Sequence, residues 1–289
     1  MFSPLFFRLC WHPQQRVVRM PSQPENLIMR ANRIRNLLDQ GKPTLATHIH
    51  SVWPNVVEAL GHTGLYDYVE FVAEYGTYTL HDLDNICRAA ELHGLGSMIK
   101  IDWANNEFVA QRAVGSGFNS VLFSDVRSAA GAADCVSYVR ADTPEAGGTF
   151  GVATRRFSYM GYGGNEAYIQ ALDEVVVALM LEKKPALDDL EGILEVDGVE
   201  MLQWGPSDFS MSIGKGGQRG DPEVAAAAQK VIDGCMAAGV HPRIEIGSAD
   251  DAKRYLDMGA RHFCIGTDIA ILHGWWQKEG EDMRKALEE

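Results

Sequence analysis

Two neighbouring apolar segments of the chain each end beside a carboxylate. The run at 174–181 is followed at once by Glu182, and the run at 199–204 is followed by Gly205 and then by Asp208. Carboxylates with open coordination positions suit a hard cation such as Mg²⁺, which binds substrate oxygens as well. A glycine beside them permits close approach of the backbone to a ligand. We therefore interpret Glu182 and Asp208 as metal ligands, although solvated loop acids are common after strands.

These segments belong to a repeating pattern of apolar runs and helical segments. The strand-like runs are at 44–50, 67–73, 97–102, 120–124, 174–181, 199–204, 242–247 and 262–266. Most are separated by stretches with apolar residues at every third or fourth position, which is typical of helices. Continuous apolar strands indicate a parallel sheet that is buried on both faces. The pattern predicts an α/β fold, a (β/α)8 TIM barrel, whose active site lies at the carboxyl ends of the strands.

Composition limits the partners of the protein. The chain has 289 residues and a formal net charge of −13, which argues against nucleic acid as the main partner. No apolar run is long enough to span a membrane. The five cysteines are scattered without a CxxC pair, as expected of a reduced cytoplasmic protein.

The domain organisation is simple. No linker divides residues 29–289, which we expect to form a single barrel domain. Residues 1–28 are interpreted as a flexible N-terminal extension. A targeting peptide, or a true start at Met20 or Met29, remains an alternative.

The segment "LEKKPALDDLEGILEVDGVEMLQWGPSDFS" resembles the class II HpcH/HpaI-type aldolases, a family related to 2-dehydro-3-deoxyglucarate aldolase and macrophomate synthase. The resemblance covers roughly residues 40–275. It implies a divalent metal, Mg²⁺ or else Mn²⁺ or Co²⁺, held by Glu182 and Asp208. It also implies that Gly205, Pro206 and Ser207 contact a pyruvate-type keto acid whose enolate the metal stabilises. A homo-oligomer, commonly a hexamer, is implied too, with the C-terminal helix packed between subunits.

The chain departs from the family at the positions that handle protons and charge. The family usually has Asp-Met-Glu-His-Gly after the second strand, where this chain has Val-Ala-Glu-Tyr-Gly, so Tyr75 stands at the position of the histidine. Lys100 matches an arginine that neutralises developing charge, and Met180 matches a glutamine. The resemblance therefore implies an intact metal pair beside an altered proton-handling set.

Several residues are candidates for the missing base. His48 and His50 end the first strand, and strand alternation places them on one face, although an isolated histidine is more often structural. Glu74 is either an acid near the metal or a capping carboxylate. Tyr75 has an ordinary pKa near ~10, far from that of an ideal base, and is equally well a wall residue. Lys100 lacks the fork of arginine but can hold a carboxylate as a point charge.

Two further features extend the candidate site. Glu245 ends the seventh strand as another acid at the rim. The irregular region 141–168 reads as a long loop, which in compact domains is often functional. Its Arg155 and Arg156 are candidates for binding a second carboxylate or a phosphate, unless the loop is simply solvated.

The sequence thus favours a divalent-metal-dependent carbon–carbon lyase acting on a small-molecule 2-keto acid. Decarboxylation of an oxaloacetate-like acid is an alternative, because it needs no removal of a carbon-bound proton. A metal hydrolase with His48, His50 and Asp268 as ligands is a weaker alternative, as is a non-catalytic keto-acid-binding barrel.

Overall fold

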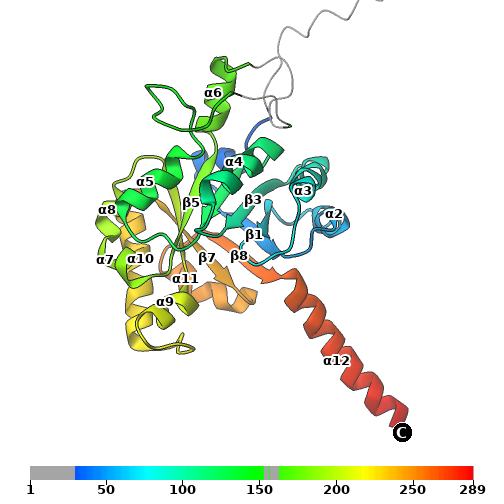
Figure 1. Cartoon of the computed structure of the whole chain (residues 1–289). Helices are drawn as coiled ribbons and strands as arrows, with labels where there is room; N and C mark the ends of the chain where they lie inside the picture. The colour runs from blue at the N-terminus through cyan, green and yellow to red at the C-terminus, as the bar shows by residue number, and fades with distance from the viewer. Residues whose placement is uncertain (1–29, 153–155, 157–162, 289) are drawn as a thin grey trace, which may run out of the picture.

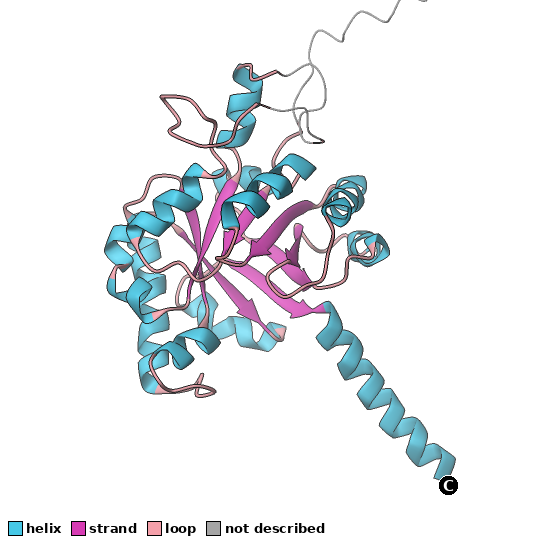
Figure 2. Ribbon diagram, in the orientation of Figure 1, coloured by secondary structure: helices cyan, strands magenta, loops and turns pink. Residues whose placement is uncertain are grey.

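The computed structural model describes residues 30–152, 156 and 163–288, so the interpretation of residues 1–28 lies outside the described part of the chain. Eight parallel strands close into a barrel in sequence order, with helices around it (Figures 1 and 2). The predicted (β/α)8 fold is confirmed. The strands are β1 (Thr44–Ile49), β2 (Tyr68–Val72), β3 (Gly96–Ile101), β4 (Ser120–Phe123), β5 (Val176–Leu181), β6 (Val199–Trp204), β7 (His241–Ile246) and β8 (His262–Thr267).

The helices occupy the outside of the barrel and the connections between strands. They are α1 (Arg33–Asp39), α2 (Pro54–His62), α3 (Leu80–Leu92), α4 (Asn106–Ser116), α5 (Ala129–Ser137), α6 (Glu166–Asp173), α7 (Lys184–Asp188), α8 (Leu190–Leu194), α9 (Pro206–Ser212), α10 (Pro222–Ala238), the 3-10 helix η1 (Ala249–Asp251), α11 (Ala252–Asp257) and α12 (Asp268–Glu288). Both α5 and α6 lie between β4 and β5, so the irregular region that begins at 141 returns the chain to the start of β5.

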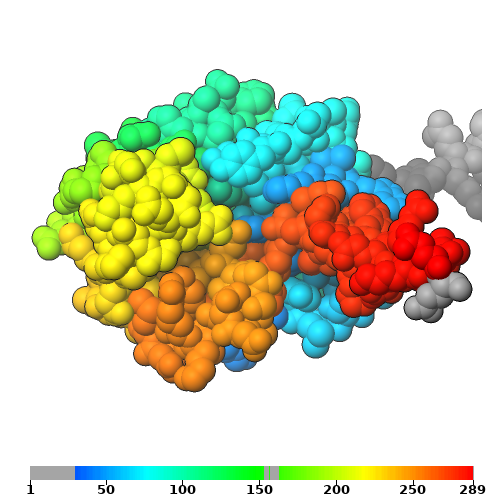
Figure 3. Space-filling model, turned by 90° about the horizontal axis from the view of Figure 1, so that it is seen from below, coloured from blue at the N-terminus to red at the C-terminus, as the bar shows by residue number. Residues whose placement is uncertain are grey.

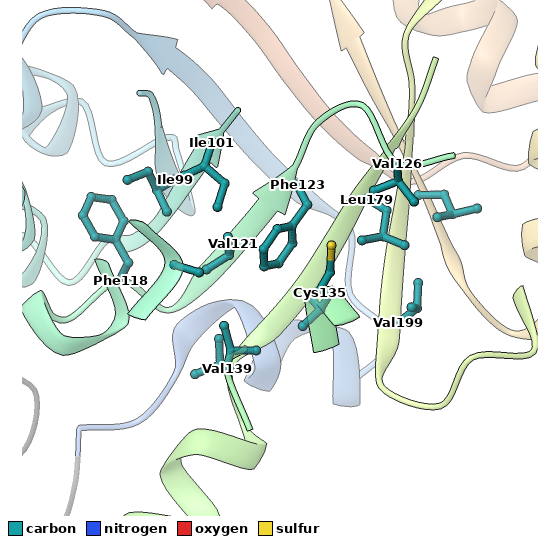
Figure 4. Packing of buried hydrophobic residues seen from close by; sticks show 14 of the residues in the cluster. Ile99, Ile101, Phe118, Val121, Phe123, Val126, Cys135, Val139, Leu179 and Val199 are labelled. Atoms are coloured by element: carbon teal, nitrogen blue, oxygen red, sulfur yellow. The ribbon is translucent and has the colours of Figure 1, made fainter. Parts of the chain in front are cut away.

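The hydrophobic core has two layers, which explains the continuous apolar strands. The inner layer fills the barrel and includes Met98, Leu122, Met201 and Cys264. The outer layer lies between strands and helices, and Figure 4 shows the part of it around Phe123. A strand that packs on both faces has no polar face to alternate with.

Helix α12 is set apart from the barrel. It begins at the end of β8 and projects away from the body of the molecule (Figures 1 and 2), and none of its residues is buried. Large side chains such as Leu272, Trp275 and Trp276 are exposed on it. Across the part of the chain that is described, no helix has both the length and the apolar character that a membrane crossing requires.

Candidate active site

A cavity of about 690 Å³ opens at the carboxyl end of the barrel. Figure 3 looks onto this end, where the surface is hollowed between the yellow segment that contains α9 and the orange-red start of α12. Tyr75, Lys100, Glu182 and residues 205–208 line the cavity. The structure therefore brings together, around one cavity, residues that the sequence places at the ends of separate strands.

Glu182 is a buried carboxylate directly after β5. Its Oε1 accepts a hydrogen bond from the backbone N–H of Asp125 at 2.9 Å, and its side chain packs against Gly205. A Cβ atom at residue 205 would lie only 2.6 Å from the Cβ of Glu182, so the turn after β6 has no room for a side chain. Burial raises the pKa of Glu182, against the opposing effects of the Asp125 N–H and of Lys100. The raised pKa means that the groups around Glu182 do not fully offset the cost of burying its negative charge.

Asp208 has a basic partner that the sequence analysis missed. The Lys183 ammonium lies 2.9 Å from Oδ1 of Asp208 and 2.8 Å from Oδ1 of Asp125. Asp125 itself has a left-handed backbone, with φ of 57°, which is uncommon for a residue other than glycine. The sequence could have predicted Asp125 at this site, because it lies two residues after β4 and acids that follow strands lie near this end of the barrel.

These residues fit a divalent cation. Two carboxylates, those of Glu182 and Asp208, line the same cavity, and Glu182 is buried without a neutralising ion pair of its own among the described residues. Oxygen ligands with open positions match the requirements of Mg²⁺. Glu182 and Asp208 would hold the ion.

Lys100 and Glu74 form a buried ion pair next to the carboxylates. Lys100 Nζ lies 2.6 Å from Oε2 of Glu74 and 5.1 Å from the centre of the Tyr75 ring. Burial alone would lower the pKa of Lys100, but Glu74 outweighs it and the pKa is raised, so the side chain is a fixed cation at neutral pH. Partial burial, together with Glu74 and Asp208, raises the pKa of Tyr75 to about 12 despite Lys100. Tyr75 is therefore poorly suited to act as a base near pH 7.

The two histidines of the first strand take different positions. His48 is buried inside the barrel, where Nε2 lies 3.0 Å from Oε1 of Glu70. His50 lies beyond the end of β1, and its backbone N–H donates to both carboxylate oxygens of Asp268 at 3.0 Å. Strand β1 ends at Ile49, and neither histidine is among the residues that line the cavity. The ligand set of the hydrolase alternative is not assembled.

Arg156 lies at the other end of the barrel. Its Nη1 lies 2.7 Å from Glu91 Oε1 and 2.8 Å from the carbonyl oxygen of Ser116, near the ends of α3 and α4. Helix α5 carries the chain back to the amino ends of the strands before this region begins, so the structure does not bring Arg156 to the cavity. Arg155 lies outside the described residues.

The cavity is also lined by residues that the pattern of strands in the sequence does not predict. Arg219, in the connection between α9 and α10, lines the cavity, as do Ile271 and Trp275 from α12. Glu245, expected at the rim, lines it as well. Arg219 is far from any strand end along the chain, which is why the strand-end rule could not find it.

A closed parallel barrel with acids and cations converging at the carboxyl ends of its strands defines the class: a (β/α)8 protein with the architecture of an enzyme active site. The model of the HpcH/HpaI aldolase/citrate lyase family matches residues 51–273, and the chain belongs to this family. The predicted resemblance is confirmed, and the family is one of aldolases and lyases.

Relatives with assigned activities cover most of the chain. It is 29% identical over 238 residues to 2-dehydro-3,6-dideoxy-6-sulfogluconate aldolase of Pseudomonas putida, covering 82% of this chain and 91% of the relative. It is 27% identical over 242 residues to 4-hydroxy-2-oxo-heptane-1,7-dioate aldolase of Salmonella heidelberg, covering 83% and 90%. An HpcH/HpaI aldolase structure from Desulfitobacterium hafniense DCB-2 superimposes with a TM-score of 0.79 at 22% identity, covering 88% and 97%.

Proposed function

We propose that the protein is a divalent-metal-dependent carbon–carbon lyase that cleaves a hydroxylated 2-keto acid and releases pyruvate. The observation that carries the proposal is that Glu182 and Asp208 line one cavity together with the cation Lys100. Glu182 and Asp208 would hold Mg²⁺, Mn²⁺ or Co²⁺. A bound ion supplies electrostatic stabilisation for negative charge that develops on the 2-keto oxygen.

The remaining wall residues suit binding of the substrate. Lys100 presents a fixed positive charge to an anionic group of the keto acid. Residues 205–207 border the same space as a turn of the backbone. Arg219, in the connection between α9 and α10, lines the same cavity and suits a second anionic group of the substrate. The two aldolase relatives support this assignment, because the names of their substrates describe 2-keto acids with a sulfo or carboxylate group at the far end.

Decarboxylation of an oxaloacetate-like acid is a second candidate reaction at this site. It is favoured by Tyr75, whose pKa is raised to about 12 at the position where the family resemblance expects a histidine. Loss of CO₂ leaves an enolate without removal of a carbon-bound proton, so it proceeds without such a base.

We also propose that the protein is a homo-oligomer in the cytoplasm and does not bind nucleic acid. The exposed large side chains of α12 support association, and the acidic net charge of −13 disfavours binding to phosphate backbones.

The test is pyruvate release from 4-hydroxy-2-keto acids and from oxaloacetate, with metal-stripped protein reloaded with Mg²⁺, Mn²⁺ or Co²⁺. Pyruvate should form only in loaded protein. Glu182→Gln and Asp208→Asn should each lower the rate by roughly 10²-fold or more, because they weaken the charge stabilisation. Asp188→Asn removes an exposed acid that pairs with Lys184 in α7 and should leave the rate unchanged. Absence of pyruvate with all three ions would disprove the proposal.

A further inference from the structure

A charged network fills part of the barrel interior beneath the cavity. Glu70 and Arg243 are both fully buried and form an ion pair, and Arg243 Nε donates to the Tyr68 hydroxyl at 2.7 Å. Barrel interiors are usually packed with apolar side chains, and buried charges carry a large desolvation cost. A buried ion pair often adds little to stability, so we looked for a functional role of the Glu70–Arg243 pair.

His48 connects this network to the cavity. One ring nitrogen, Nε2, lies 3.0 Å from Oε1 of Glu70, and the other, Nδ1, lies 3.5 Å from Oε1 of Glu245. Glu245 is 49% exposed and lines the same cavity as Glu182 and Lys100. The imidazole thus lies between a buried carboxylate and one that faces the substrate space. Closure of the barrel makes this arrangement, since β8 pairs with both β1 and β7.

The charges support a histidine that keeps its proton. Burial alone would raise the pKa of Glu70, but Arg243 and His48 outweigh it and hold that pKa below its usual range. Burial alone would lower the pKa of His48, but Glu70 outweighs it and the pKa is raised well above its usual value. An ionised Glu70 therefore faces a protonated His48 at neutral pH.

A metal ion is a poorer explanation for the same cluster. Ligand atoms of His48, Glu70 and Cys264 lie within 4.8 Å of one another, which is close enough for a shared ion. However, the Arg243 guanidinium already pairs with Glu70 and is fully buried, so a dication would add charge beside an existing cation. The arrangement fits a chain of ion-pair contacts from Glu70 through His48 to Glu245 better than a metal centre.

Glu245 differs from Glu74 and Asp208 in the residue that contacts its carboxylate. Glu74 is paired with Lys100, and Asp208 is paired with Lys183. Glu182 is buried after β5 and is used as a ligand in the proposed function. Glu245 is the acid on the wall that a histidine, rather than a lysine, contacts.

We propose that Glu245 is the catalytic base of the proposed lyase, and that His48, anchored by Glu70, is the residue that positions it. This rests on the proposed function. In the cleavage direction, the Glu245 carboxylate takes the proton from the C4 hydroxyl while the C3–C4 bond breaks. The hydroxyl carbon becomes an aldehyde, and the electron pair of the broken bond passes to the enolate of pyruvate. The protonated Glu245 then returns the proton to C3, so that the keto acid yields aldehyde and pyruvate without net proton change.

The test compares two reactions in one protein. Exchange of the C3 protons of pyruvate in D₂O, followed by proton NMR, requires a base, whereas decarboxylation of oxaloacetate does not. With Mg²⁺ present, Glu245→Gln should slow exchange by roughly 10²-fold or more and change decarboxylation less than about threefold. His48→Gln should slow exchange roughly tenfold with the same selectivity. A merely structural role would lower both reactions together.

Glu223→Gln is the matched control. Glu223 is 52% exposed and pairs with Lys215 away from the cavity, so its loss should affect neither reaction. Exchange that persists in Glu245→Gln, or an equal loss of both reactions in Glu245→Gln or in His48→Gln, would overturn the assignment. If the unaltered protein decarboxylates oxaloacetate but does not exchange the C3 protons of pyruvate, the assignment of Glu245 as the base is wrong. The proposal that the protein is a lyase is then unaffected. A protein that releases no pyruvate from 4-hydroxy-2-keto acids or from oxaloacetate with any of the three ions would overturn the proposed function and this inference with it.

Discussion

The Lys183 ammonium lies 2.9 Å from the Asp208 carboxylate, one of the two acids that we propose as metal ligands. A cation from the protein and a cation from solution therefore compete for the same oxygen atoms. The same ammonium also holds Asp125 at 2.8 Å, so it is fixed at the edge of the site rather than free in the cavity.

Removal of this competitor should strengthen metal binding. We expect Lys183→Met to bind Mg²⁺ about tenfold more tightly, a gain of about 1.4 kcal/mol, because Asp208 loses an internal partner. Isothermal titration calorimetry measures the change. Lys184→Met is the control, since Lys184 pairs with Asp188 on the surface of α7. Weaker binding in Lys183→Met would instead show that the lysine orients Asp208 for the ion.

Lys100 should have a structural and a substrate-binding role that can be separated. Lys100→Met leaves Glu74 buried without its partner, so we expect a loss of roughly 1–3 kcal/mol in the free energy of unfolding together with reduced substrate use. In Lys100→Met/Glu74→Gln the unpaired charge is gone, so stability should recover while kcat/KM stays low. Urea unfolding and steady-state kinetics distinguish the two effects. Full recovery of kcat/KM in the double variant would exclude Lys100 from substrate binding.

Gly205→Ala should disturb Glu182 specifically. The added Cβ would lie 2.6 Å from the Glu182 Cβ and 2.8 Å from its Oε2, so the carboxylate must move. The backbone φ of −110° is open to alanine, and strain at residue 205 itself is small. We expect at least tenfold weaker Mg²⁺ binding by calorimetry, since a ligand is displaced. Gly216→Ala, whose Cβ would meet nothing within 4 Å, should bind normally. Equal affinities in the two variants would remove Glu182 from the ligand set.

His262 should make the protein less stable in mild acid. Burial, assisted by His241 and Arg243, lowers the pKa of His262 to about 3, whereas the unfolded chain keeps a value near ~6.5. Between these values the unfolded state binds a proton that the folded state does not, so stability falls as pH falls, by about 1.4 kcal/mol per pH unit. From pH 7 to pH 5 the protein should lose about 2 kcal/mol more than His262→Gln.

Urea unfolding at the two pH values measures this difference. The exposed His81 provides the control, because His81→Gln should keep the pH dependence of the unaltered protein. The same slope in all three proteins would mean that His262 takes up its proton in the folded state as readily as in the unfolded state.

Helix α12 should mediate self-association. Its exposed Leu272, Trp275 and Trp276 are large apolar side chains without cover in a single chain. We expect light scattering after gel filtration to show an oligomer, and Leu272→Lys/Trp276→Lys to shift it toward the monomer. Lys278→Ala, which alters a charged side chain on the same helix, should not. A monomer in the unaltered protein would contradict this expectation.

The sequence by itself determined the barrel and brought the two acids that we propose as metal ligands to the same end of it. The number and spacing of apolar runs are local properties, and parallel topology then places Glu182 and Asp208 just beyond the ends of two neighbouring strands. The position of Lys100 at the end of β3 followed from the same rule. Such predictions need only the order of elements and the direction of the strands.

Only the tertiary structure decided which charges pair. The contact of His48 with Glu245 crosses from β1 to β7 through the closed barrel, and no spacing along the chain announces it. Likewise, the strand pattern does not predict that Lys183 forms an ion pair with Asp208. Arg156 was misplaced because α5 reverses the chain before its loop begins. Ion pairs depend on side-chain directions and on distances of a few ångströms between remote segments, and packing alone sets these.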